Sequence, residues 1–103
     1  MSAMKLYSFW RSGTSHRTRI ALNLKGLSTE YVAVHLAKEE HLKDAFKAIN
    51  PQQLVPALDT GSEVLIQSPA IIEWLEEKYP TPALLPRDPQ RRAQVRALAA
   101  IVA

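Results

Sequence analysis

A change from strand-like to helical periodicity and back, within the first 36 residues, constrains the fold most. Residues 5–9 form a short apolar and aromatic run, and residues 31–36 form a second run that is β-branched and almost continuously apolar. Between them, apolar residues recur with the helical period over residues 15–25, and Gly26 follows where a left-handed cap is wanted. The pattern predicts a βαβ unit whose second strand is covered on both faces, as in a parallel pair.

The pattern of apolar residues over residues 38–66 predicts a second helix and then a β-hairpin. Apolar residues at helical spacing among charged ones favour a half-exposed helix over residues 38–49, which Asn50-Pro51 ends. The apolar runs 54–59 and 63–66 flank a Thr-Gly-Ser turn, which is typical of a hairpin. Pro56 must then lie at the first residue or the edge of its strand, because proline cannot donate to the ladder.

A third helix is predicted from Ser68 until Pro80 ends it. We expect an apolar side made of Ile71, Trp74, Leu75 and Tyr79. We expect an opposite, mostly solvent-facing side made of Glu73, Glu76, Glu77 and Lys78. The order βαβ, α, ββα indicates an α/β fold of one small domain over residues 1–80.

Residues 81–103 read as a linker and one further helix. Prolines over residues 81–88 suggest a linker, and Asp88 with Pro89 starts a helix. Its apolar face consists of Val95, Leu98, Ala99 and Val102. Since the chain stops within that apolar stripe, we expect residues 89–103 to be the truncated start of a second, all-helical domain.

Composition excludes several classes of protein. A chain of 103 residues has room for one core, and 47% hydrophobic with 22% charged residues is globular composition. The net charge of +3 is spread along the chain, which argues only weakly for nucleic acid. The absence of cysteine excludes disulfides and a protein thiol nucleophile, so that any sulfur chemistry must come from a cofactor. No window approaches a membrane span, and we expect a cytoplasmic protein.

Metal and hydrolase sites are not expected. His16, His35 and His41 lack the spacing of zinc ligands. The serines lie outside any Gly-x-Ser-x-Gly elbow, and no phosphate-binding Gly-x-x-x-x-Gly-Lys loop occurs.

Two predicted helix N-termini could bind anions. One follows the hydroxyl-rich residues 11–17 and the other begins at Gln67-Ser68. Free N–H groups and the helix dipole favour a carboxylate or thiolate there, although both patterns also fit plain N-caps. Pro56 is either an ordinary strand edge or a cis residue that exposes the backbone of Val55 to a ligand.

Several spaced motifs carry a resemblance to a known family. Residues 9–22 (FWRSGTSHRTRIAL), 55–58 (VPAL) and 67–76 (QSPAIIEWLE), with Asn50-Pro51 and residues 84–86 in register, resemble the N-terminal domain of zeta-class glutathione transferases, the maleylacetoacetate isomerase family. The resemblance implies a thioredoxin-like fold followed by an all-helical domain. It also implies glutathione as cofactor and a homodimer.

Site residues follow from the resemblance position by position. It places the glutathione thiolate near Ser12, Thr14 and Ser15, with all three hydroxyls eligible to stabilise it, because many members have Cys where Thr14 stands. It assigns the γ-glutamyl carboxylate to Gln67 and Ser68, and the cysteinyl backbone to Val55 before a cis Pro56. The glycyl end is placed near His41, and Gln53 is included among the glutathione-binding residues.

The implied reaction is cis–trans isomerisation of a maleyl diacid, maleylpyruvate or maleylacetoacetate, by reversible addition of the glutathione thiolate. Arg11, beside the thiolate loop, is the candidate cation for the substrate carboxylates. Two alternatives stay open. One is general glutathione transfer, by conjugation or dehalogenation, and the other is a non-catalytic glutathione-binding module if 103 residues is the natural length.

Overall fold

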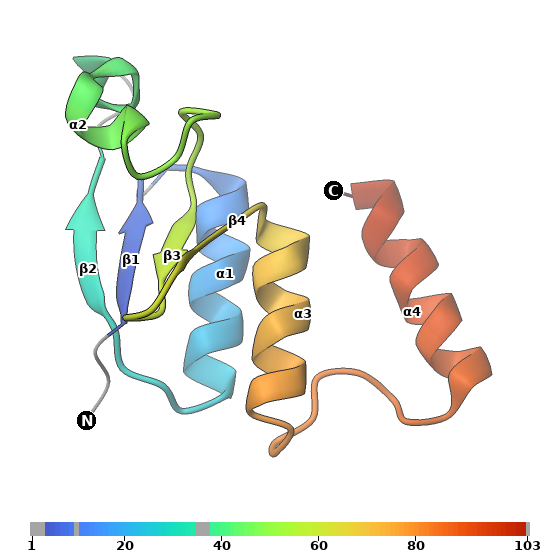
Figure 1. Cartoon of the computed structure of the whole chain (residues 1–103). Coiled ribbons are helices and arrows are strands. Elements are labelled where there is room, and N and C mark those ends of the chain that lie inside the picture. Colours follow the sequence, from blue (N-terminus) through green and yellow to red (C-terminus); the bar gives the residue numbers. More distant parts are fainter. Residues whose placement is uncertain (1–3, 10, 35–37, 103) are drawn as a thin grey trace.

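The computed structural model describes residues 4–9, 11–34 and 38–102. Their elements form one mixed sheet with helices packed against it, and a last helix that stands beside this body (Figure 1). The thioredoxin-like α/β order predicted from the sequence is confirmed.

The sheet has four strands in the order β2-β1-β3-β4. β1 (Lys5–Ser8) runs parallel to β2 (Glu30–Ala33) on one side and antiparallel to β3 (Ala57–Asp59) on the other. β4 (Val64–Ile66) completes the predicted hairpin with β3. Pro56 directly precedes β3, where its missing N–H breaks no ladder bond.

The prediction of a second strand covered on both faces is wrong. β2 is shorter than expected and lies at the edge of the sheet, and Tyr31 is 44% exposed. The helices pack over the central strands β1 and β3 and leave this edge open. The end of the predicted strand, residues 35 and 36, lies outside the described residues.

Two helices cover one face of the sheet side by side (Figure 1). α1 (Gly13–Leu24) begins two residues earlier than predicted because the Ser12 side chain caps it, and α3 (Ser68–Lys78) matches the prediction. Gly26 has a φ of 70°, as its expected role after α1 requires. The core beneath both helices contains Met4, Leu6, Ala21, Leu22, Leu58, Ile71 and Leu75.

The opposite face carries a smaller cluster of Val34, Phe46 and Ala57. The prediction of a single helix over residues 38–49 is wrong. Two separate short helices stand there, η2 (Glu40–Leu42) and α2 (Asp44–Lys47). Lys43 between them is extended, with φ −77° and ψ 151°. The break lets Phe46 pack against Tyr7, 6.0 Å between ring centroids, while Leu42 stays 52% exposed.

The last helix, α4 (Pro89–Val102), begins as predicted at Asp88, whose carboxylate accepts the N–H of Arg91 at 3.0 Å. Its expected apolar side is largely exposed, with Val95 at 36% and Leu98 at 65%, and Ile101, which was not included in that side, is 80% exposed. The side chain of Val102 lies outside the described part of the chain.

Glu76 departs from the predicted solvent-facing side of α3, because it is buried, with 6% of its surface exposed. Lys25, the residue that ends α1, supplies the partner charge that makes this burial possible.

Candidate glutathione site

The turn before α1 organises the hydroxyl groups predicted to serve a thiolate. The Ser12 hydroxyl accepts the N–H of Ser15 at 3.2 Å, which makes Ser12 the N-cap. It also lies 2.9 Å from the Thr14 hydroxyl, and Thr14 in turn donates to the Val55 carbonyl at 3.1 Å. The turn is therefore tied to a loop 41 residues away in the chain.

Counting protons gives this chain of hydrogen bonds a direction. A hydroxyl carries one hydrogen, and that of Thr14 is used on the Val55 carbonyl. The hydrogen between the two hydroxyls must then come from Ser12. Ser12 is half-buried and stands at the end of this series of hydrogen bonds. Its hydroxyl hydrogen can turn towards a ligand without breaking the Thr14–Val55 hydrogen bond.

Asn50 shapes the loop that ends at Val55. Its side chain is 1% exposed, donates to the Leu54 carbonyl at 2.9 Å and accepts the N–H of Gln52 at 2.9 Å. The peptide bond between Val55 and Pro56 is cis, as predicted. The Val55 carbonyl lies beside the N-terminus of α1, where it accepts the hydrogen bond from the Thr14 hydroxyl.

The start of α3 forms the other side of the site. Gln67 has a left-handed φ of 71°, and its side chain makes no capping bond but donates to the Gln52 side chain at 2.8 Å. Ser68 is the first helical residue and is buried. The Gln67 side chain does not cap α3. The backbone N–H groups of the first turn of α3, and the positive end of its dipole, are therefore available to an anionic ligand.

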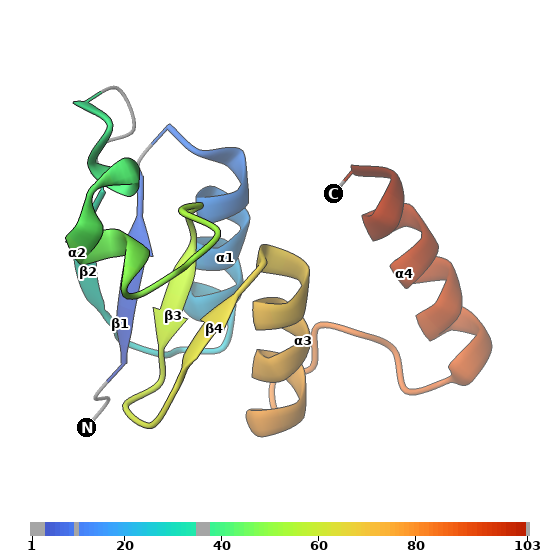
Figure 2. The same ribbon diagram turned by 45° about the horizontal axis from the view of Figure 1, so that its top comes forward.

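A hollow of about 210 Å³ lies where these segments meet. Figure 2 brings this end of the molecule forward, with the loop before β3 between α2 and the first turns of α1 and α3. The lining residues are Thr14, Asn50, Gln52, Leu54, Val55, Pro56, Gln67 and Ser68.

The structure brings together half of the predicted site. Thr14, Val55, Pro56, Gln67 and Ser68 line the hollow. Ser12 adjoins it through Thr14, and Arg11 is exposed on the turn before α1.

Three of the predicted site residues do not line the hollow: Ser15, His41 and Gln53. Ser15 is completely buried and its hydroxyl accepts the N–H of Phe9 at 3.5 Å, so it supports the turn from beneath. His41 lies in η2 and Gln53 has a φ of 58°, and neither lines the hollow.

Sequence reasoning missed Asn50, Gln52 and Leu54 as lining residues. It used Asn50-Pro51 only as a helix stop. A buried asparagine that bonds both ends of its own loop is the signal that could have marked the loop as a built feature.

Within the described ranges, no group of three or more His, Cys, Asp or Glu side chains could hold a metal ion. His35 lies outside those ranges. In the same part of the chain, every helix is too short or too polar to cross a membrane.

Comparison with known proteins identifies the family. The glutathione S-transferase N-terminal domain family matches residues 6–83 of this chain. The chain belongs to that family. The matched residues include both helix N-termini, the loop before β3 and all of the sheet except Lys5, and they end before α4.

Three relatives are particularly similar. A maleylpyruvate isomerase from Ralstonia sp is 83% identical over 99 residues, covering 96% of this chain and 47% of the relative. A holo structure of a maleylpyruvate isomerase, described as a bacterial glutathione S-transferase of the zeta class, superimposes with a TM-score of 0.94 at 83% identity, covering 95% of this chain and 46% of that one.

The third is a maleylacetoacetate isomerase from Methylobacterium extorquens AM1 with bound malonate and glutathione. Its TM-score is 0.93 at 48% identity, covering 96% of this chain and 47% of that one. The chain thus spans about half the length of the relatives it matches.

Proposed function

We propose that this chain is the glutathione-binding half of a zeta-class isomerase that converts a cis maleyl diacid, maleylpyruvate or maleylacetoacetate, into its trans isomer. The observation that carries the proposal is the convergence of two helix N-termini and the Val55 backbone on one hollow. The names of the relatives support the reaction, and a relative with bound glutathione and malonate supports both the cofactor and a diacid substrate.

The γ-glutamyl end of glutathione is assigned to the start of α3. Its carboxylate would accept the backbone N–H of Ser68 and a bond from the Ser68 hydroxyl, where the helix dipole favours negative charge. Gln67 lies next to it and is held by Gln52. The cysteinyl backbone would pair with Val55 in the manner of an added strand.

Ser12 is assigned the hydrogen bond to the thiolate. Ser15 is fully buried, and the proton of Thr14 is used on Val55, which leaves Ser12 as the hydroxyl able to turn towards sulfur. Thr14 and Ser15 hold the turn in place. The glycyl end is assigned to His41 and Gln53 on the family resemblance alone.

When bound, glutathione supplies a thiolate nucleophile that adds reversibly to the cis double bond and so permits rotation about it. The chain's part is electrostatic. The N-terminus of α1 and the Ser12 hydroxyl keep the sulfur ionised. Arg11 is assigned to one substrate carboxylate, because guanidinium groups bind carboxylates in two-point geometry.

Calorimetric titration of the chain with glutathione tests the binding half of the proposal. The double variant Gln67→Ala/Ser68→Ala should weaken binding by about 1.5–3 kcal/mol, the range for hydrogen bonds to charged groups. Ser62→Ala, an exposed hydroxyl in the hairpin turn, is the matched control. Unchanged affinity in the double variant would remove the carboxylate assignment.

Turnover assays would separate isomerisation from conjugation or dehalogenation. Conversion of maleylpyruvate or maleylacetoacetate without consumption of glutathione supports the isomerase. Stoichiometric loss of glutathione supports a transferase that conjugates its substrate.

We also propose a homodimer that works in the cytoplasm. The exposed apolar residues of α4, Leu98 and Ile101, support association with further protein surface. Analytical ultracentrifugation tests the dimer.

A further inference from the structure

Lys25 and Glu76 form a buried ion pair outside the hollow. Lys25 ends α1, and Glu76 lies near the end of α3. The Lys25 Nζ atom is 2.7 Å from Glu76 Oε1, and the two side chains are 0% and 7% exposed. Burying two charges is unfavourable unless further hydrogen bonds satisfy them, so the remaining partners decide what the pair does.

The further hydrogen bonds of the pair come from the segment between α3 and α4. Lys25 Nζ also donates to the Pro82 carbonyl at 2.6 Å. The Leu84 N–H donates to Glu76 Oε1 at 2.9 Å, and the Leu85 N–H donates to Oε2 at 3.0 Å. We call Lys25, Glu76 and these three backbone groups the buried hub.

The region predicted as a linker is therefore fastened to the domain just before α4 begins. The Leu84 side chain packs against the main core, which adds an apolar contact at the same place. Arg92, in the first turns of α4, brings one guanidinium nitrogen to 3.7 Å from Glu76 Oε2.

A second link between α3 and α4 is of a different kind. Arg96 donates to Glu73 at 2.6 Å, but the two side chains are 54% and 35% exposed. Exposed ion pairs contribute little and are screened by salt, whereas buried ones are screened much less.

α4 stands on the far side of α3 from α1 and runs in the opposite direction to α3 (Figures 1 and 2). Its C-terminal end points to the same end of the molecule as the first turns of α1 and α3.

We propose that Lys25 and Glu76 are positioning residues for α4, and that the buried hub, not the exposed Arg96–Glu73 pair, determines where α4 stands relative to the sheet. The inference is independent of the proposed function, because it concerns an ion pair outside the hollow and a contact between two parts of the chain itself.

Distance measurements between two spin labels test the proposal. The chain contains no cysteine, so Glu63→Cys on the hairpin and Ala99→Cys on α4, both exposed, give two specific labelling positions. The distribution of distances should be narrow, and it should stay narrow at about 1 M sodium chloride, where the Debye length is about 3 Å. Broadening by salt would show that the exposed pairs hold α4 and would overturn the proposal.

Variants in the labelled chain then compare the two links. Glu76→Gln replaces an acceptor oxygen with a donor that faces the N–H of Leu85 or Leu84, and it should broaden the distribution and lower amide-exchange protection of both residues at least tenfold. Glu73→Gln is the matched control and should change neither. A narrow distribution in Glu76→Gln would contradict the proposal.

An apolar pair separates positioning from mere stability. Lys25→Met/Glu76→Leu keeps the volume of the buried pair, and such replacements often preserve stability, so this variant should fold even if Glu76→Gln does not. It cannot accept the N–H groups of Leu84 and Leu85. We expect a thermal midpoint near that of the parent together with a broad distribution, and a narrow one would contradict the proposal.

Discussion

The hydroxyl of Thr14 donates a hydrogen bond to the carbonyl of Val55 at 3.1 Å, and this contact joins the first turn of α1 to the loop before β3. One side of the hollow carries the turn that holds the Ser12 and Thr14 hydroxyls, and the other carries the backbone of Val55. The distance between the proposed thiolate and cysteinyl-backbone subsites is therefore set by a hydrogen bond within the protein.

Replacing Thr14 tests that bond. Thr14→Val keeps the shape but removes the donor, so the free energy of unfolding should fall by about 0.5–1.5 kcal/mol and glutathione affinity should fall with it. Thr14→Ser, which retains the hydroxyl, should stay close to the parent in both. Urea unfolding and calorimetry measure the two effects, and a Thr14→Val chain that binds glutathione like the parent would refute the spacing role.

Ser12 should control the ionisation of bound glutathione. Ser12→Ala and Ser12→Gly both remove the hydroxyl, and each should raise the pKa of the bound thiol by about 1–2, the equivalent of one charge-assisted hydrogen bond. The two variants differ in capping, because alanine costs about 0.5–2 kcal/mol of stability and glycine a few tenths. Ultraviolet titration of the thiolate measures the pKa. An unchanged value in Ser12→Gly would exclude Ser12 as the thiolate donor.

Glu76 should make the chain sensitive to acid. Burial raises its pKa, but hydrogen bonds from Lys25, Leu84 and Leu85 outweigh burial and hold the pKa below the ordinary value of 4.5. The charged groups that face it are Lys25 and Arg92. Because the folded-state pKa is lowered, this stabilisation is complete above pH 4.5 and is lost as pH falls through the lowered value.

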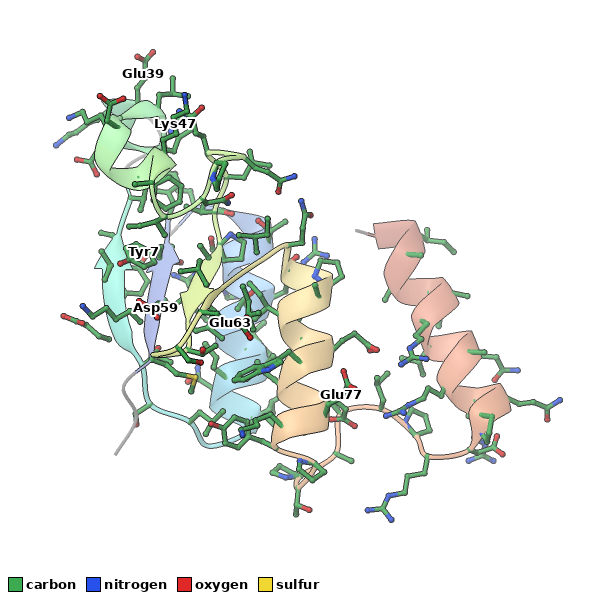
Figure 3. All side chains as sticks on the ribbon, in the orientation of Figure 1. Tyr7, Glu39, Lys47, Asp59, Glu63 and Glu77 are labelled. Atoms are coloured by element: carbon green, nitrogen blue, oxygen red, sulfur yellow. The ribbon has the colours of Figure 1, made fainter. Side chains whose placement is uncertain are left out.

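Unfolding curves between neutral and acid pH check this prediction. Glu76→Gln should flatten the loss of stability in that range, whereas Glu77→Gln, an exposed carboxylate on the side of α3 that faces α4 (Figure 3), should leave the parent profile unchanged. An equal acid response in the parent and in Glu76→Gln would contradict the assignment.

The exposed face of α4 should cause self-association of the 103-residue chain. Burying a leucine or isoleucine is worth about 1.5–3 kcal/mol, and Leu98 and Ile101 are 65% and 80% exposed. Leu98→Arg/Ile101→Arg should yield monomers in analytical ultracentrifugation. Leu24→Arg, at a comparably exposed apolar position on α1, should not. A parent chain that sediments as a monomer at all concentrations would contradict this prediction.

Periodicity predicted the sheet and the long helices well because those signals are local. The strand–helix alternation of residues 5–33 and the start of α3 at Ser68 follow from spacing and capping alone. The break at Lys43 could not be predicted, because it depends on Phe46 reaching the face of a sheet built from distant segments.

The buried position of Glu76 shows the same limit more sharply. On a helical projection Glu76 belongs to the charged side of α3, and its burial depends on Lys25, 51 residues earlier. The candidate site divides in the same way. The helix N-termini could be predicted from the local sequence. The roles of Gln52 and Asn50 could not, because they depend on how one loop meets the start of α3.

Glutathione binding at the hollow can be measured by NMR titration of the ¹⁵N-labelled chain. We expect saturable shift changes concentrated at the amides of Val55 and Ser68 and in the turn from Ser12 to Ser15, with the Thr60–Ser62 turn unaffected. Absence of saturable binding, or changes centred on the second hollow of about 230 Å³ beside Tyr7 and Phe46, would contradict this expectation.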